Sequence, residues 1–201
     1  MVRVTADAKQ ATRARLLAAA AEEFGRAGLE RASVDAISLA AGYGKGTIYN
    51  YFPSKEDLFL AVVEEASAQA GPSAPARQDA PARERLEATL AGFCAWAGEH
   101  DAFARVLVRE CLMGTPGLYP RVIGAEWPLT GELEAIVRDR AGRGELRADV
   151  PAEVLAQAIA GLTDLALAQH WASGGTRPSL EEIPGLVLAL LLGTRPGGDS
   201  P

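Results

Sequence analysis

The feature that most constrains this fold is a pair of short helical segments separated by a glycine turn, within residues 33–52. Ser33 can cap the first segment, which carries one inward apolar face of Val34, Ile37, Ala40 and Ala41. Gly42-Tyr43-Gly44 then interrupts the pattern, and residues 45–52 form the second segment. Two short helices joined in this way are typical of a helix-turn-helix, although the same pattern occurs in helical proteins that bind no DNA.

The second segment has a polar outer face that suits DNA. Ile48 and Phe52 lie four residues apart and can face inward. The outward residues are then Lys45, Gly46, Thr47, Tyr49 and Asn50. Lysine can donate to guanine or phosphate and asparagine can pair with an adenine edge, while hydroxyl groups commonly hold phosphates.

The residues around this motif resemble a known family. The stretch GLERASVDAISLAAGYGKGTIYNYFPSKEDLF closely resembles the N-terminal DNA-binding region of the tetracycline-repressor (TetR) family, through Gly28, Ala41-Gly42, Gly46-Thr47-Ile48-Tyr49, Tyr51-Phe52, Ser54-Lys55-Glu56 and Leu58. The resemblance covers the first quarter to third of the chain. It implies an all-α fold in which a three-helix DNA-binding domain precedes a helical ligand-binding and dimerisation domain. It also implies a homodimer that represses transcription until a small molecule releases it from a near-palindromic double-stranded DNA operator.

Carried over by position, the resemblance implies a set of DNA contacts: Ser33, Tyr43, Lys45, Gly46, Thr47, Tyr49, Asn50 and Lys55. Within this set, Ser33, Tyr49 and Lys55 match positions that usually grip phosphates. Two residues depart from the family pattern. Gly44 stands where Ser or Thr is common, so we expect a weakly capped second helix. Ala32 replaces a common threonine, which leaves the first phosphate contact to Ser33 alone.

The chain divides by composition and helical periodicity. We expect a DNA-binding domain over residues 1–53, a connecting helix over 54–70 begun by Ser54, a loop over 71–82, a helical domain over 83–193 and a disordered tail over 194–201. No alternating strand pattern is present. The helices are expected at 7–26 (ended by Gly28), 83–99, 101–113, 119–143 (kinked or divided at Pro128), 151–172 and 179–192.

Charge and motif content favour some classes of function over others. The net charge is −6, but residues 1–55 hold eight Lys and Arg against five Asp and Glu, so the basic part coincides with the motif. With two cysteines and no signal peptide, we expect a cytoplasmic protein, and the longest apolar run, residues 186–192, is too short for a membrane. We see no nucleophile elbow, phosphate-binding loop or metal quartet, so we expect no enzyme, cofactor or metal. The alternative is a helical small-molecule-binding protein or enzyme with a vestigial headpiece.

The last two predicted helices carry apolar residues on more sides than one chain of this size can cover. Val154, Ala158, Gly161 and Leu165 form a second row on the helix over 151–172, and residues 186–192, with Leu186 and Leu190, are apolar all around. We therefore predict a homodimer in which these helices pair with their copies as a four-helix bundle.

The middle of the chain gathers most of the aromatic residues and both histidines. The candidate ligand-binding residues are Phe93, Trp96, His100, Phe103, Leu107, Glu110, Tyr119, Trp127 and His170. A largely apolar pocket with a few polar groups is typical of a small-molecule site, so we expect a largely apolar effector. The alternative is plain core, with Glu110 paired to Arg105 or Arg138. If Glu110 or Asp164 lies unpaired in the pocket, a cationic effector becomes attractive.

Overall fold

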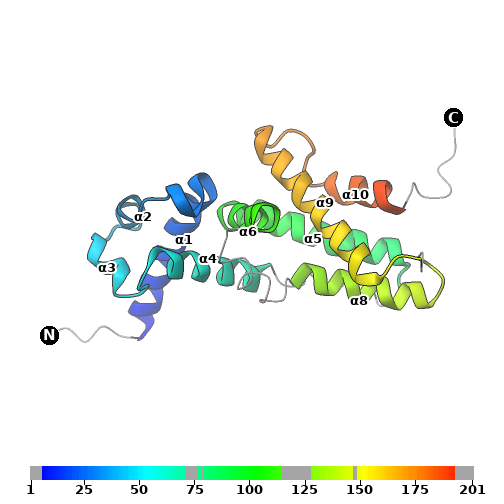
Figure 1. The fold of residues 1–201 in the computed structure, drawn as a ribbon, viewed down its shortest axis with the longest axis horizontal. Coiled ribbons are helices and arrows are strands. Elements are labelled where there is room, and N and C mark those ends of the chain that lie inside the picture. Colours follow the sequence, from blue (N-terminus) through cyan, green and yellow to red (C-terminus); the bar gives the residue numbers. More distant parts are fainter. Residues whose placement is uncertain (1–5, 71–76, 78, 115–127, 147–148, 193–201) are drawn as a thin grey trace.

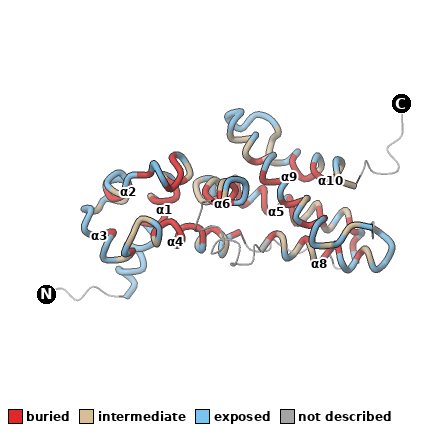
Figure 2. Tube along the Cα trace, in the orientation of Figure 1, coloured by how far each residue is buried: buried red, intermediate tan, exposed pale blue. Residues whose placement is uncertain are grey.

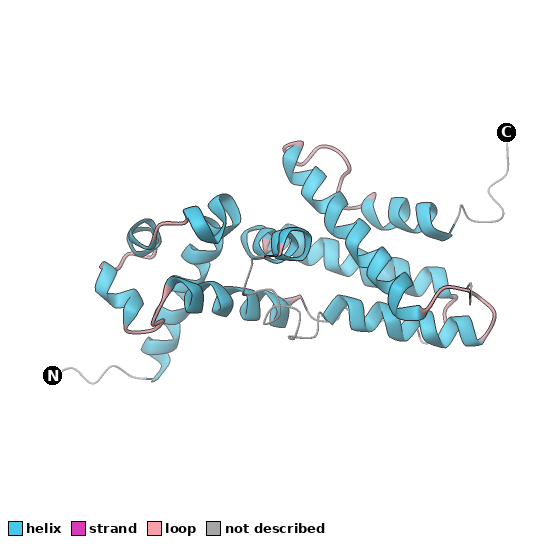
Figure 3. Cartoon of the chain, viewed as in Figure 1, coloured by secondary structure: helices cyan, strands magenta, loops and turns pink. Residues whose placement is uncertain are grey.

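The chain is all-helical, as predicted, in the part that the structure describes (Figures 1 and 3). This computed structural model describes residues 6–70, 77, 79–114, 128–146 and 149–192. The helices are α1 (Ala6–Arg31), α2 (Val34–Ala40), α3 (Lys45–Tyr49), α4 (Lys55–Gln69), α5 (Ala82–Glu99), α6 (Asp101–Met113), α8 (Pro128–Gly142), α9 (Ala152–Ala172) and α10 (Ile183–Leu192). Helices α1 to α3 form a headpiece at one end of an elongated molecule, and α4 leads from it to the remaining helices (Figure 1).

The headpiece closes around the predicted apolar stripe of α1. Leu16, Ala20 and Phe24 are fully buried, and the Phe24 ring meets the Phe59 ring of α4 edge to face at 5.1 Å between centroids. Ile48 and Phe52 bury themselves in the same core, as their spacing predicted. Burial of these side chains fixes the position of α3, which at five residues is too short to be stable alone.

Two details of the headpiece correct the sequence-based expectation. Ala40, which was expected to face inward, is exposed. Ser38 is buried instead, next to Ile37. Positions 34, 37, 38 and 41 share one side of a helix, so residue 40 turns away from the core. The regular helix of α3 also ends at Tyr49, three residues before the predicted end.

Gly28 interrupts the first helix where the sequence predicted a stop. Its φ of 73° and ψ of 168° are not helical, although helical turns resume after it and α1 extends to Arg31. Only glycine adopts such angles without strain. Gly28 lies directly against Arg109 of α6.

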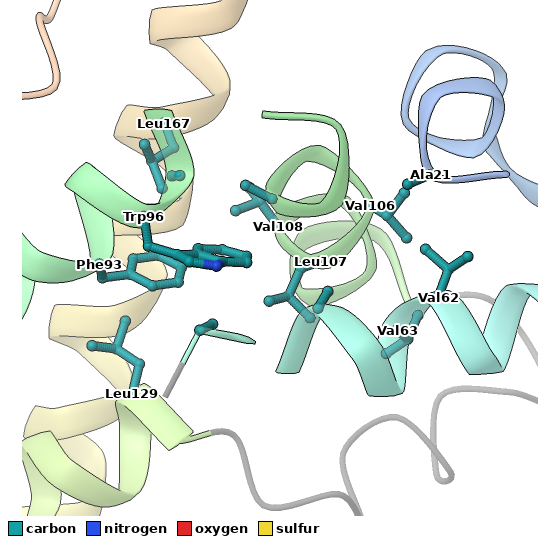
Figure 4. Close-up of a cluster of buried hydrophobic side chains, with 14 of the residues drawn as sticks. Ala21, Val62, Val63, Phe93, Trp96, Val106, Leu107, Val108, Leu129 and Leu167 are labelled. Atoms are coloured by element: carbon teal, nitrogen blue, oxygen red, sulfur yellow. The ribbon is translucent and has the colours of Figure 1, made fainter. Parts of the chain in front are cut away.

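The helical domain begins at α5, and its helices pack through shared apolar faces. Helix α8 lies along α5 and α9, while α10 covers α5 and α9 from the other side. Helix α6 contacts α1, α4 and α9, and therefore connects the two domains. Figure 4 shows Val106 of α6 directed toward Ala21 of α1 and Val62 of α4, with Phe93 and Trp96 of α5 on the other side of α6. A continuous buried core thus joins the headpiece to the helical domain.

Local capping signals set several helix starts. Ser54 Oγ accepts from the Asp57 N–H at 3.0 Å and donates to the Asp57 carboxylate at 2.7 Å. Ser179 and Glu182 form the predicted reciprocal pair, and α10 then begins at Ile183. Pro184 falls in the first turn, where no backbone N–H is required.

Several expectations fall outside the described residues. They concern the helix portion over 119–127, most of the loop over 71–82, and the tail over 194–201. Helix α8 begins at Pro128, the residue at which a division was expected. No helix in the described part of the chain is both long and apolar enough to cross a bilayer.

Candidate DNA interface and effector site

The helix-turn-helix is held together by side-chain and backbone hydrogen bonds. Ser33 caps α2, because its Oγ accepts from the Ala36 N–H at 3.3 Å. The Ser33 N–H in turn donates to Glu23 of α1 at 3.1 Å. Gly42, with a φ of 79°, makes the turn, and the Tyr43 N–H donates to the Ser38 carbonyl at 2.9 Å. These bonds fix where α3 leaves the turn.

Helix α3 presents its polar side to solvent at the outer edge of the headpiece (Figure 2). Lys45, Gly46, Tyr49 and Asn50 are exposed, and Thr47 is half-buried. Ile48 is buried and anchors the opposite side. Gly44 caps α3 without a side-chain hydrogen bond, as its lack of a side chain predicted. The polar face is therefore exposed to solvent, over an apolar anchor.

Asp35 of α2 is a charged residue of this surface that sequence reasoning missed. Its carboxylate lies 2.9 and 3.1 Å from Lys45 Nζ, and both side chains are exposed. This hydrogen bond and the charge of Asp35 raise the pKa of Lys45. The signal available in sequence was an acidic residue in the first turn of α2, which is more often a helix-dipole contact.

Lys55 and Tyr43 connect other parts of the headpiece. Lys55 Nζ donates to the carbonyls of Glu30 at 3.1 Å and Ala32 at 3.5 Å, so its cation lies beside the α1–α2 junction. The Tyr43 hydroxyl donates to Thr12 at 3.3 Å. That hydrogen bond, together with the nearby Arg15 guanidinium, lowers the pKa of Tyr43.

The helical domain brings part of the candidate effector set together. Phe93 and Trp96 are buried and stacked, with ring centroids 5.6 Å apart and planes 21° apart, and Leu107 of α6 lies close to them (Figure 4). Phe103 is half-buried against the core, and Glu110 is buried. Arg105 and Arg138, considered from sequence as partners of Glu110, pair with Asp101 and Glu134.

The two histidines have separate environments. His100 is exposed between α5 and α6, with its ring 5.9 Å from Trp96. The His170 ring is half-buried near the end of α9, where Nδ1 lies 2.8 Å from the Pro178 carbonyl. Its imidazole therefore holds the turn between α9 and α10. Tyr119 and Trp127 lie outside the described residues.

Asp164 of α9 is a more unusual feature than either histidine. The residue is 4% exposed, and its buried carboxyl oxygen Oδ1 accepts no hydrogen bond from a described residue. Burial raises the pKa of Asp164 to about 8. Burial and the Asp164 carboxyl together raise the pKa of Cys94 on α5 to about 12. The indole Nε1 of Trp96 is likewise buried without a hydrogen-bond partner among the described residues.

The predicted dimer residues lie on the outside of the chain. Val154, Leu165 and Leu186 are each about half exposed, and Leu190 is 76% exposed. Gly161 is exposed and Ala158 is half-buried. Removing apolar side chains of this size from water is favourable in free energy. This row on α9 and α10 is therefore suited to contact with a second copy of the chain.

The headpiece presents an exposed polar helix within a helix-turn-helix, and a second helical domain follows it. This arrangement is that of a helix-turn-helix transcription regulator. The family model described as "Bacterial regulatory proteins, tetR family" matches residues 16–62. The transcriptional repressor SCO4008 of Streptomyces coelicolor is 30% identical over 151 residues, which are 71% of each chain. The transcriptional repressor AcnR of Corynebacterium diphtheriae is 28% identical over 176 residues, or 87% of this chain and 88% of the relative. The chain belongs to the tetR family of DNA-binding transcriptional regulators.

Solved structures show the same fold over nearly the whole chain. FadR from Bacillus subtilis, in complex with stearoyl-CoA, is similar with a TM-score of 0.69 and 21% identity, covering 90% of this chain and 99% of that one. A tetR-family regulatory protein from Rhodococcus RHA1 gives a TM-score of 0.74 at 23% identity, covering 90% and 95%.

Proposed function

We propose that this regulator is a homodimeric repressor that binds a near-palindromic operator through α3 and leaves it when a small molecule enters the helical domain. The observation that carries the proposal is the outer face of α3, where Lys45, Gly46, Tyr49 and Asn50 are exposed. Ile48, on the opposite side of the helix, is buried and anchors it. The naming of SCO4008 and AcnR as repressors supports the direction of regulation. A regulator of this kind acts where the bacterial chromosome lies, in the cytoplasm.

The DNA contacts that we propose are Ser33, Tyr43, Lys45, Gly46, Thr47, Tyr49, Asn50 and Lys55. Lys45 and Asn50 would read base edges, because both are exposed on α3. Ser33, Tyr49 and Lys55 would hold phosphates. The position of Lys55 beside Glu30 and Ala32 supports its role, since its cation lies near the capped start of α2.

The test is selection of bound fragments from the source genome by the purified full-length protein, followed by titration at several salt concentrations. Lys45→Ala or Asn50→Ala should cost about 1–3 kcal/mol at one operator position and relax the preference there. Lys55→Ala should weaken all sequences alike and lower the salt slope by about 1. If no DNA is enriched by a stable dimer, the protein is instead a helical binding protein with a vestigial headpiece. If none of the substitutions affects DNA binding, α3 is not the reading helix.

For the effector we propose a largely apolar molecule that also carries a basic or hydrogen-bonding group. Phe93, Trp96 and Leu107 supply buried apolar surface, and Asp164 supplies a buried acid without a hydrogen bond to any described residue. An unpaired buried carboxyl costs stability, and such groups concentrate at binding sites. A cation would restore the ionised form of Asp164 by pairing with it.

A panel of dodecylamine, dodecanol and stearoyl-CoA tests this class of effector, with stearoyl-CoA chosen because the FadR structure holds it. Dodecylamine should release operator DNA at lower concentration than dodecanol, and Asp164→Asn should remove the difference. Stronger release by stearoyl-CoA, unchanged by Asp164→Asn, would indicate an acyl-CoA effector and contradict the role of Asp164. Turnover of any of these compounds would favour the enzymatic alternative.

A further inference from the structure

A groove at the junction of the two domains is separate from the candidate effector residues. It lies between the end of α1 and helices α6 and α9, and has a volume of about 420 Å³. Gly25 of α1 forms one edge, Val108, Leu112 and Met113 come from α6, and Ala168 and Trp171 come from α9. Leu112 is 42% exposed and Met113 is 76% exposed, so the apolar surface of the groove is open to solvent. A volume of this size suits a small organic molecule.

Two arginines of α6 also line the groove, and they differ in their partners. The Arg105 guanidinium lies 5.0 Å from the centroid of the Trp171 ring and pairs with Asp101 at 2.6 Å. Arg109 forms no hydrogen bond or ion pair with any residue that the structure describes. The groove therefore combines an apolar surface with one positive charge that no described residue neutralises.

The groove touches both domains because two glycines let α1 and α6 come close. A Cβ atom at Gly25 would lie 3.2 Å from the Ala102 carbonyl oxygen and 3.3 Å from Arg105 Cβ. One at Gly28 would lie 2.7 Å from the Arg109 guanidinium. A molecule in the groove would thus contact the headpiece at Gly25 and the helical domain at Trp171 together.

We propose that this groove binds a small anionic amphiphile, with its apolar body on Leu112 and Trp171 and its anionic end on Arg109. A carboxylate, sulfonate or phosphate group would form charge-assisted hydrogen bonds with the planar guanidinium. A neutral apolar molecule would leave Arg109 without a partner. The site is independent of the effector site proposed above. Because the occupant contacts both domains, its affinity depends on how α1 lies against α6.

The experiment uses the full-length protein and two fluorescent probes with the same aromatic skeleton: anionic 8-anilinonaphthalene-1-sulfonate and neutral N-phenyl-1-naphthylamine, which lacks the sulfonate. Arg109→Gln should weaken the sulfonate about tenfold, the effect of losing one charged hydrogen-bonding partner. It should change the affinity of the neutral probe by less than about twofold. Arg143→Gln, just after the end of α8, removes the same charge elsewhere and should change neither affinity. Leu112→Ser, at a partly exposed position, should weaken both probes.

The proposal is overturned if Arg109→Gln leaves sulfonate binding unchanged, or weakens both probes equally. It is also overturned if Leu165→Asp monomers bind the sulfonate and dimers do not, because the groove would then be covered by a second copy. An unfolding midpoint for each variant, measured without probe, confirms that it is folded. Binding of DNA fragments in the absence of probe tests the proposed DNA function separately. A negative result for probe binding in the groove therefore leaves the DNA-binding result unaffected.

Discussion

Burial changes the protonation of individual side chains in this protein. The clearest case is Asp164, a residue that is 4% exposed among the helices of the second domain and whose carboxyl oxygen Oδ1 has no hydrogen bond to a described residue. Desolvation disfavours its charged form, which raises the pKa of Asp164 from 3.8 to about 8. The folded protein therefore binds one proton more tightly than the unfolded chain does.

This pKa shift predicts a pH dependence of stability. Between the two pKa values the unfolded chain holds fewer protons, so the Asp164 contribution weakens folding as pH rises from about 4 to about 8, by about 1.4 kcal/mol per pH unit at most. Asp164→Asn should remove this dependence. Thermal unfolding at about pH 5 and about pH 8, at one protein concentration, should show a larger fall for the native chain than for the variant. Parallel pH profiles would show that Asp164 is already ionised in the folded protein.

Asp35 gives a second prediction at the scale of one residue. Its carboxylate pairs with Lys45 and would lie near DNA phosphates when α3 reads a groove. Asp35→Asn should raise affinity for all sequences about three- to tenfold at low salt and steepen the salt dependence, because one negative charge that repels the DNA phosphates is removed. Fluorescence anisotropy with operator and random duplexes measures both quantities. Glu99→Gln on α5 makes the same charge change outside the headpiece and is the control; an equal gain in both variants would exclude a local effect.

At the scale of helices, the contact between α1 and α6 depends on residues that lack side chains. Gly28 has backbone angles that are almost exclusive to glycine and lies directly against Arg109. Gly25 allows the α6 backbone to approach closely. Helix α6 also packs on α4 and α9, so this contact links the headpiece to the helical domain.

Replacing Gly28 with alanine should therefore destabilise the protein by about 1–3 kcal/mol, because the backbone angles become strained and Arg109 must move. Gly131→Ala is a matched control, since no heavy atom lies within 4 Å of the added Cβ in α8. That variant should be stabilised by about 0.5–1 kcal/mol. Chemical denaturation of both variants gives the comparison. Equal stabilities would mean that the break in α1 relaxes without cost.

For the whole molecule, the uncovered apolar row on α9 and α10 determines the expected assembly. Val154, Leu165, Leu186 and Leu190 would remain in water if the chain were a monomer. A symmetric dimer that covers them would carry two copies of α3, and dimeric helix-turn-helix proteins bind two half-sites on one duplex.

Leu165→Asp should shift the monomer–dimer equilibrium toward monomer by at least about tenfold, because a charge would be buried without a partner. Leu39→Asp is the control: Leu39 is 81% exposed on α2, away from this row, and the change should leave the dimer intact. Analytical ultracentrifugation measures both equilibria. A Leu165→Asp variant that dimerises like the native chain would place the interface elsewhere.

Local features of this protein were predictable from the sequence. The bounds of α6, the caps at Ser33 and Ser54, the Ser179–Glu182 pair and the break at Gly28 depend on residues a few positions apart, and each lies where the sequence predicted. The buried stripe of α1 and the exposed face of α3 were predictable for the same reason, because helical periodicity alone assigns their sides. The exception is Ala40, which was predicted to face inward but is exposed, while Ser38 is buried.

The sequence by itself therefore determined most of the helices, their order and the exposed polar face of α3. Only the tertiary structure decided the pairing of Asp35 with Lys45, the isolation of Asp164, the contact of His170 with the Pro178 carbonyl, and the groove at Arg109. The physical reason is that capping and periodicity act over one or two helical turns. Burial and electrostatic environment depend on which helices pack together, and no local pattern specifies that packing.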